Sequence, residues 1–214
     1  MKVKLCGFTD KDSVSEALAN KVDFIGFVFC KGSVRYISPN QVAEISRIIP
    51  STTAKVAVLA DSDMETISEI HKNLAADYFQ FHGHETVEFL QKVKEKFPQV
   101  KIIKAFRVAT TDDLAQVDEF NYVADLFLFD SKSKSSDGVL GGSGEVFNWK
   151  ILHDFKSKKD WFLSGGLNAG NVIEALQISG ANMVDISSGI EKIRGQKSPE
   201  LIKQLMEILK NYVA

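Results

Sequence analysis

Reactive side chains stand at the ends of several short apolar runs in this sequence. Cys6 ends the first run, Asp130 follows Leu126–Phe129, and Asp185 follows another run near the carboxyl end. A carboxyl group in a partly apolar site has a raised pKa, so it can act as a general acid near neutral pH. A thiolate can act as a base or nucleophile once a neighbouring cation lowers its pKa from about 8.5. Cys6 and Asp130 are therefore candidates for proton transfer.

Cys6 has a second interpretation, because cysteine is often fully buried as a small apolar residue. Its position alone does not decide between packing and reactivity. Lys4 has the same parity along the predicted strand and points to the same face, so its ammonium is our candidate for the cation that lowers the thiol pKa. We interpret the second cysteine, Cys30, as structural. Arg35, taken alone, is interpreted as a surface charge.

Two turns rich in glycine and serine predict a phosphate site. They are Ser164–Leu167 (SGGL) and Asp185–Glu191 (DISSGIE), and each lies between a short apolar run and a helical pattern. Small side chains let backbone N–H groups approach an anion, and the dipole of a following helix favours negative charge. Consecutive turns of this kind, late in the chain, are where a (β/α)₈ barrel usually holds phosphate.

The elements that position these residues alternate between strand and helix along the whole chain. Strands are expected at about 3–6, 23–29, 54–59, 78–81, 101–106, 126–130, 161–163 and 183–186, with helices at about 10–20, 39–49, 64–74, 86–97, 111–118, 149–155, 171–179 and 199–213. This alternation requires a parallel sheet. We expect an α/β fold, a single-domain (β/α)₈ TIM barrel over residues 1–214. An open doubly wound sheet is the alternative, but eight similar units leave no obvious edge strand.

Composition narrows the class of protein. The 214 residues are 44% hydrophobic and 25% charged with a net charge of −2, which is ordinary for a globular protein and gives no electrostatic case for binding nucleic acid or a membrane. Neither a stretch of 18 apolar residues nor a signal peptide is evident, and two cysteines are too few for a disulfide framework. We therefore expect a cytoplasmic protein. A complete barrel without an apolar surface stripe is expected to be a monomer.

No metal site is expected, because the strand ends lack a closely spaced cluster of His, Cys and carboxylate groups. The pair His82 and His84 is a weak metal signal by itself. A long polar loop follows Asp130 and contains Gly141–Gly144. This loop is either a flexible linker or a lid over the acid, and Val139 and Leu140 within it belong to such a lid or to an interface.

Five motifs, in order, resemble those of the phosphoribosylanthranilate isomerase family of tryptophan biosynthesis. The family patterns are K-[IV]-C-G-[ILF]-T, Q-L-H-G-x-E, L-D-S…G-G-T-G…F-D-W, A-G-G-L and D-V-S-S-G-V-E. The matching stretches are Lys4–Thr9, Gln80–Glu85, Phe129–Ser131 with Gly141–Gly144 and Phe147–Trp149, Ser164–Leu167, and Asp185–Glu191. The resemblance reaches from residue 4 to about residue 197, so it covers nearly the whole chain.

The resemblance implies a TIM barrel that catalyses an Amadori rearrangement without a cofactor. The substrate would be N-(5-phosphoribosyl)anthranilate and the product 1-(2-carboxyphenylamino)-1-deoxyribulose 5-phosphate. Cys6 would be the general base and Asp130 the general acid. The resemblance also implies substrate contacts: Arg35 to the anthranilate carboxylate, Asp185 to sugar hydroxyls, Gln80 and His82 along the pocket wall, and phosphate on the amides of Gly165, Gly166, Ser187, Ser188 and Gly189.

Four positions depart from the family patterns. Val34 replaces the Pro of S-P-R before Arg35, and Ser164 replaces the Ala of A-G-G-L. Asn148 replaces the Asp of F-D-W, and Ser198 replaces an Asp near the carboxyl end. None of these changes removes a proposed catalytic group, but the first makes the placement of Arg35 less secure.

Three alternatives remain open from the sequence. One is a different phosphosugar isomerase or epimerase barrel, although a metal-dependent version would need ligands that we cannot assemble. A second is a bifunctional isomerase that also serves histidine biosynthesis. A third is a non-catalytic barrel that binds a phosphorylated ligand. All three share a phosphorylated small molecule as the partner.

Overall fold

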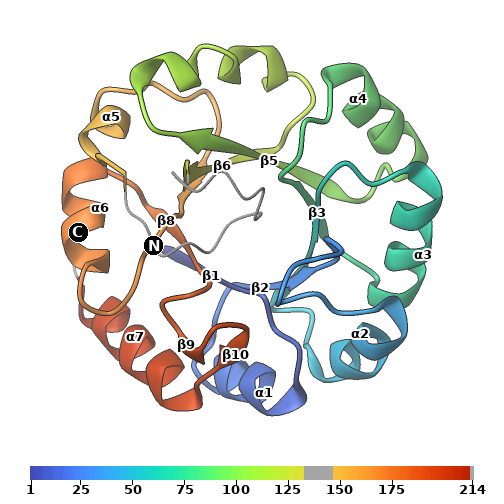
Figure 1. Ribbon diagram of the computed structural model, residues 1–214, viewed down its shortest axis with the longest axis horizontal. Helices are drawn as coiled ribbons and strands as arrows, with labels where there is room; N and C mark the ends of the chain where they lie inside the picture. Colours follow the sequence, from blue (N-terminus) through green and yellow to red (C-terminus); the bar gives the residue numbers. More distant parts are fainter. Residues whose placement is uncertain (133–146, 213–214) are drawn as a thin grey trace.

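Eight parallel strands close into a barrel in the computed structural model, which describes residues 1–132 and 147–212 (Figure 1). Each strand pairs with the next in chain order, and β1 also pairs with β8. The strands are β1 (Lys2–Cys6), β2 (Phe24–Val28), β3 (Ala54–Leu59), β4 (Tyr78–Phe81), β5 (Lys101–Val108), β6 (Leu126–Ser131), β7 (Trp161–Leu163) and β8 (Met183–Ile186). The closed order confirms the TIM barrel and excludes the open sheet.

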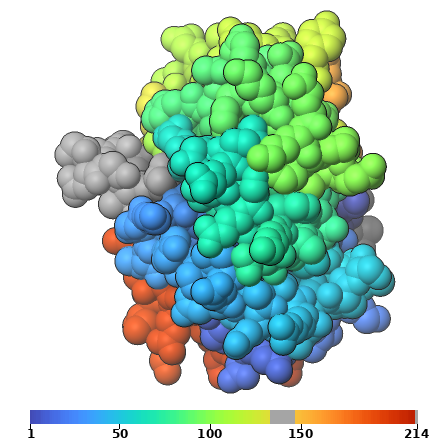
Figure 2. Space-filling view, turned by 90° about the vertical axis from the view of Figure 1, so that its right-hand side faces the viewer, coloured from blue at the N-terminus to red at the C-terminus, as the bar shows by residue number. Residues whose placement is uncertain are grey.

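Helices surround the barrel as an outer ring (Figure 1). They are α1 (Lys11–Ala19), α2 (Pro39–Ile45), α3 (Met64–Leu74), α4 (Val87–Lys96), α5 (Lys150–His153), α6 (Val172–Ser179) and α7 (Pro199–Asn211), and the short 3₁₀ helix η1 (Ser46–Ile48) extends α2. Figure 2 shows the side of the molecule where α3 and α4 cover the barrel wall. None of the helices in the described ranges is long and apolar enough to cross a membrane.

Capping side chains begin the helices where the sequence predicts. Asp10 and Asp63 each accept a hydrogen bond from the backbone N–H three residues further on. Ser38 forms a reciprocal capping box with Gln41, directly before the helix that starts at Pro39. These bonds satisfy N–H groups that have no partner inside the helix. Local sequence therefore fixes where these three helices begin.

The fifth unit differs from the expected pattern, and the predicted α-helix at 111–118 is wrong. The chain forms two short 3₁₀ helices there, η2 (Thr111–Leu114) and η3 (Val117–Phe120). The apolar residues Leu114, Val117 and Phe120 recur every third position. Side chains three apart eclipse one another in a 3₁₀ helix, so this spacing suits it better than the 3.6-residue period of an α-helix.

A small hairpin between β8 and α7 was not expected from the sequence. Its strands are β9 (Glu191–Ile193) and β10 (Gln196–Lys197), which pair in antiparallel fashion. The turn contains Gly195 at φ +88°, a left-handed conformation that glycine adopts without steric cost. The side chains of Glu191 and Lys197, one from each strand, form an ion pair at 2.8 Å.

Two apolar cores support the barrel. The larger fills the space between strands and helices, and the smaller lies inside the barrel. Phe24 forms the centre of the inner core, with its ring edge-on to Tyr78 at 5.4 Å and to Phe162 at 5.2 Å between centroids. This floor excludes water from the lower half of the barrel, so the polar residues above it lie in a largely dry site. The expected lid at Gly141–Gly144, with Val139 and Leu140, lies outside the described residues.

Candidate active site

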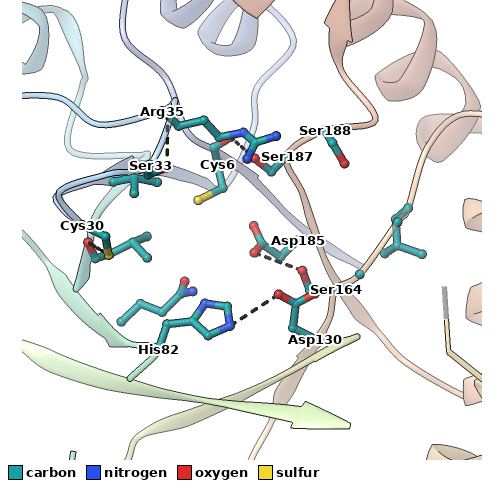
Figure 3. A pocket seen from close by; sticks show the side chains of 16 residues that line it. Cys6, Cys30, Ser33, Arg35, His82, Asp130, Ser164, Asp185, Ser187 and Ser188 are labelled. Carbon is teal, nitrogen blue, oxygen red and sulfur yellow. Dashed lines mark hydrogen bonds and ion pairs between the residues drawn. The ribbon is translucent and has the colours of Figure 1, made fainter. Parts of the chain in front are cut away.

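A cavity opens at the carboxyl ends of the strands (Figure 3). Counted out to its open mouth, it encloses about 660 Å³. Ten of the eleven residues singled out from the sequence line it: Cys6, Arg35, Gln80, His82, Asp130, Gly165, Gly166, Asp185, Ser187 and Ser188. The eleventh, Gly189, lies behind the lining, where its backbone packs against Leu167 and Asn168.

Beneath the cavity lies a buried ion pair between Lys4 and Asp185. The Lys4 side chain is 0% exposed, and its Nζ donates a hydrogen bond to Asp185 Oδ1 at 2.9 Å. The two residues face each other because β1 and β8 pair in register at this point. Although burial alone would lower the pKa of Lys4, the charge of Asp185 and then of Cys6 raises it above its ordinary value. The ammonium is therefore charged.

Gly26 leaves the room in which the Cys6 thiol lies beside this ammonium. It pairs with Cys6 across β1 and β2. A Cβ on Gly26 would lie 2.7 Å from Cys6 Sγ and 3.2 Å from Lys4 Nζ. The thiol and the ammonium therefore both lie next to the space that a side chain at position 26 would fill. Burial raises the pKa of Cys6 despite the opposing effect of Lys4. The thiol is thus protonated at neutral pH in this state, and Lys4 is the neighbour that favours its ionisation most.

Asp130 and His82 lie together across the cavity from Cys6 (Figure 3). Asp130 Oδ2 is 3.4 Å from His82 Nε2, and Asp130 Oδ1 accepts the backbone N–H of Ser131 at 2.9 Å. Burial, and next the charge of Asp185, raise the pKa of Asp130 to about 6. Burial, followed by the charge of Arg107, lowers the pKa of His82 to about 3. The site therefore pairs a carboxyl that can hold a proton near neutrality with a neutral imidazole.

The first glycine-rich turn has a backbone that needs glycine, whereas the second leads into the hairpin of β9 and β10 and not directly into the expected helix. Gly165 and Gly166 have φ values of +89° and +65°, and a Cβ on Gly165 would lie 2.6 Å from the Ser131 nitrogen. Only glycine therefore fits at this turn. Ser187 is tied to the end of β1, because its hydroxyl donates to the Cys6 carbonyl at 3.0 Å. Both turns border the cavity on the side of β7 and β8.

Arg35 is a buried residue, 4% exposed, and its interpretation as a surface charge is wrong. Its Nε and Nη2 donate to Glu191 Oε1 and Oε2 at 2.6 and 2.8 Å. Lys197 Nζ donates to the same carboxylate at 2.8 Å. Sequence reasoning did not assign Glu191 and Lys197 to the site; the only signal was that Glu191 ends the DISSGIE motif.

Other polar residues at strand ends take no part in this arrangement. Asp61 is exposed and accepts the His84 backbone N–H at 2.6 Å, outside this cavity. Arg107 lines a second cavity between α4 and η3. Cys30 lines the first cavity, but burial raises its pKa to about 12, so its thiol is unreactive. Residues 1–132 and 147–212 contain no group of three His, Cys or carboxylate residues that could hold a metal ion.

The structure shows the surroundings of the departures at Ser164 and Val34. The Ser164 hydroxyl lies 3.5 Å from Asp185 Oδ2, so it extends the buried pair of Lys4 and Asp185. Val34 is 55% exposed, and Arg35 beside it still reaches the cavity wall. Replacement of proline at position 34 therefore leaves the buried position of Arg35 intact.

Comparisons with known proteins give one consistent result. The family model for N-(5'-phosphoribosyl)anthranilate (PRA) isomerase matches residues 3–208. The chain is 39% identical over 213 residues to the N-(5'-phosphoribosyl)anthranilate isomerase of Zymomonas mobilis, covering 98% of each. It is similar to the crystal structure of phosphoribosyl anthranilate isomerase from Thermotoga maritima, with a TM-score of 0.88, 30% identity, and coverage of 99% of this chain and 100% of that chain. A phosphoribosyl anthranilate isomerase solved with reduced 1-(o-carboxyphenylamino)-1-deoxyribulose 5-phosphate gives 0.83 at 28% identity, with the same coverage.

Replacement of Asp130 by Asn is expected to stabilise the fold at neutral pH. The pKa of this carboxyl is about 6 in the folded protein and about 3.9 in an unfolded chain. The folded state binds the proton more tightly, so the wild type loses stability relative to Asp130→Asn as pH rises from about 4 to about 6. Above that range the loss is complete, on the order of 3 kcal/mol. Urea unfolding of both proteins at pH 4 and pH 7.5 measures it.

Asp113→Asn is the control of opposite sign. Hydrogen bonds from the backbone N–H groups of Thr110 and Ala109 lower the pKa of Asp113 to about 2, so its loss is expected to destabilise the protein at pH 7.5. A stability difference between wild type and Asp130→Asn that is equal at the two pH values would show that the site does not disfavour the Asp130 charge.

Proposed function

The chain belongs to the N-(5'-phosphoribosyl)anthranilate isomerase family, and we propose that it rearranges N-(5-phosphoribosyl)anthranilate with Cys6 as general base and Asp130 as general acid. One observation carries the assignment of these roles. A thiol beside a buried ammonium and a carboxyl with a pKa of about 6 line the same cavity, and two turns suited to phosphate border it. The activity makes the protein an isomerase of tryptophan biosynthesis.

The substrate is anchored at both ends in this proposal. Its phosphate binds the turns at Gly165–Gly166 and Ser187–Ser188, with Gly189 supporting them from behind and contributing its amide. Its carboxylate binds Arg35, whose side chain lies close to Ser187. Asp185, Gln80 and His82 contact the sugar between these anchors. Two fixed ends leave the ribosyl group little freedom, which places C2 near Cys6 and the ring oxygen near Asp130.

The acid step opens the ring. Asp130 gives its proton to the furanose oxygen, the C1–O bond breaks, and the nitrogen lone pair forms an iminium at C1. A pKa of about 6 keeps a useful fraction of Asp130 protonated near neutral pH while leaving it acidic enough to give up the proton. His82, as a neutral imidazole 3.4 Å from Asp130, adds no charge that would lower this pKa.

The base step moves the double bond. The iminium acidifies the C2 proton, the Cys6 thiolate removes it, and the enolamine that forms tautomerises to the ketose. Asp130 has then lost one proton and Cys6 has gained one. Both groups are restored if the Cys6 thiol gives its proton to C1 and the Asp130 carboxylate takes the proton of the C2 hydroxyl during the tautomerisation. The iminium supplies the electron sink, and the rearrangement changes no overall oxidation state, so this chemistry proceeds without a cofactor.

Lys4 favours the thiolate that this step requires. Burial raises the pKa of the thiol, and the Lys4 ammonium opposes that effect. The cationic iminium adds a second positive charge near the thiol once the ring opens, which lowers its pKa further at the moment of proton transfer. We propose a monomeric, single-domain, cytoplasmic enzyme, because one chain supplies every residue of the described cavity and the family is biosynthetic.

Complementation tests the function. The wild-type gene is expected to restore growth of a tryptophan auxotroph that lacks this isomerase, and the Asp130→Asn gene is expected not to. Purified Asp130→Asn should turn over roughly 10²–10⁴-fold more slowly yet still bind the reduced product analogue. Wild-type turnover in this variant would remove Asp130 from the mechanism. A histidine auxotroph lacking the corresponding isomerase tests the broader specificity in the same assay.

The two cysteines provide a matched pair of variants. Both are buried and line the cavity, but only Cys6 lies beside Lys4. Cys6→Ala is expected to lower kcat by roughly 10²–10⁴-fold or more, because the positioned base is lost. Cys30→Ala removes the same atoms and should keep kcat near the wild-type value. Steady-state kinetics of the two variants checks this, and equal losses would contradict the assignment of the base.

Lys4→Met is expected to raise the pKa of the Cys6 thiol and to lower kcat. The pH dependence of iodoacetamide labelling, measured in a Cys30→Ala background, reports this pKa directly. Lys101→Met, which removes an exposed lysine from the start of β5, is the control. An unchanged thiol pKa in Lys4→Met would refute the role given to Lys4.

A further inference from the structure

We propose that Glu191 is a positioning residue that gives the site its preference for a carboxylated substrate, by holding Arg35 with one edge of its guanidinium toward the cavity. The inference rests on the proposed function, in which Arg35 binds the anthranilate carboxylate. Glu191 itself touches no substrate in this account. It acts through Arg35.

The pairing of Arg35 with Glu191 fixes the plane of the guanidinium. Nε donates to Oε1 at 2.6 Å and Nη2 to Oε2 at 2.8 Å, and both side chains are almost completely buried. A two-point contact of this kind sets orientation as well as distance. It uses two of the five N–H groups of the guanidinium. The edge formed by Nη1 and the second Nη2 hydrogen is left for an anion, and Arg35 lines the cavity.

Glu191 has no capacity left for a ligand of its own. Oε1 also accepts from Lys197 Nζ at 2.8 Å, and Oε2 from the Gly195 backbone N–H at 3.1 Å. With the two bonds from Arg35, this fills the four acceptor sites of a carboxylate. Burial opposes ionisation, but the hydrogen bonds from Arg35 and Lys197 lower the pKa of Glu191 to about 2. The carboxylate is therefore a fixed, charged support.

The same carboxylate links the two ends of the substrate site. Lys197 Nζ also donates to the backbone oxygen of Ser187 at 2.9 Å and to its hydroxyl at 3.2 Å. Ser187 belongs to the turn assigned to phosphate. The hairpin of β9 and β10 thus holds the carboxylate-binding arginine and the phosphate-binding turn in one buried cluster, Arg35–Glu191–Lys197–Ser187.

Gly7 shows how closely this cluster is packed. A Cβ on Gly7 would lie 2.6 Å from Arg35 Cδ, 3.1 Å from Ser187 Oγ and 3.3 Å from Lys197 Nζ. Side chains from the loop after β2, the turn after β8 and strand β10 therefore converge on one glycine, directly after the thiol at Cys6. Such packing leaves the Arg35 side chain one position while Glu191 is present.

The charges of the cluster favour an anionic substrate. Two cations share one carboxylate, which leaves one net positive charge beside the cavity. Loss of the Glu191 charge would leave Arg35 and Lys197 to repel each other in a buried site. We expect Arg35 then to move from its place, so the net charge would rise while the aimed contact is lost. The higher net charge predicts tighter binding of the carboxylated substrate, whereas the lost contact with Arg35 predicts weaker binding. The experiment separates these two effects.

The test compares two substrates, N-(5-phosphoribosyl)anthranilate and N-(5-phosphoribosyl)aniline, which lacks the carboxylate. The measured quantity is the ratio of their kcat/KM values. Glu191→Gln is expected to lower this ratio roughly tenfold to a hundredfold, the range for one hydrogen-bonded charge contact, mainly through KM of the carboxylated substrate. The kcat/KM of the aniline compound should fall less, because it shares only the phosphate contact, which the cluster supports through Lys197 and Ser187. Glu174→Gln, an exposed residue of α6, is the matched control.

The outcomes separate the positioning role of Glu191 from the carboxylate site at Arg35. Arg35→Met is run in parallel. A lower ratio in Arg35→Met with an unchanged ratio in Glu191→Gln overturns the positioning role alone. An unchanged ratio in Arg35→Met overturns the carboxylate site itself, and the role of Glu191 with it. If Glu191→Gln does not fold, Glu191→Asp takes its place. The Asp side chain keeps the charge but is too short to hold both Arg35 nitrogens, so the kcat/KM ratio is again expected to fall. A wild-type ratio in this variant would overturn the proposal.

Discussion

The buried ion pair of Lys4 and Asp185 is the constraint on which the rest of the site depends. A fully buried ammonium is costly unless a hydrogen-bonded partner offsets the loss of water, and Asp185 supplies it because β1 and β8 pair in register. The pair caps the apolar floor around Phe24 and begins the polar half of the barrel. Cys6 lies beside it only because Gly26 has no side chain. Asp185 also raises the pKa of Asp130, so one pair influences both proposed proton-transfer groups.

The burial that shifts the pKa values of Asp130 and His82 costs folding stability and prepares these groups for proton transfer. Burial holds Asp130 partly protonated and keeps His82 neutral, and both effects oppose charge that water would otherwise stabilise. The two thiols show how local this control is. Cys6 and Cys30 border one cavity, yet only Cys6 has an ammonium as its neighbour. The glycine-rich turns add no reactive group, and their proposed part is to hold the sugar so that C2 meets the thiol.

The sequence was informative where a structure follows from neighbouring residues. Apolar runs located most of the strands and helices, and residue parity placed Lys4 on the same face as Cys6. It was uninformative where a contact joins distant segments: Arg35 and Glu191 are 156 positions apart, so no local pattern shows that the arginine is buried. The hairpin of β9 and β10 has strands of three and two residues, too short to give a periodic signal. In the fifth unit, residues 111–118 were interpreted as an α-helix although their apolar residues recur every third position.

The central claim is that Cys6 and Asp130 face the reacting atoms of a substrate held at both ends. A crystal structure of this protein with reduced 1-(o-carboxyphenylamino)-1-deoxyribulose 5-phosphate tests it most directly. We predict the phosphate on the turns at Gly165–Gly166 and Ser187–Ser188, the carboxylate on Arg35, and C2 about 3–3.5 Å from Cys6 Sγ, the separation of reacting atoms. A complex in which C2 lies away from Cys6 would contradict the account. So would one in which the carboxylate lies on the glycine-rich turns and the phosphate on Arg35.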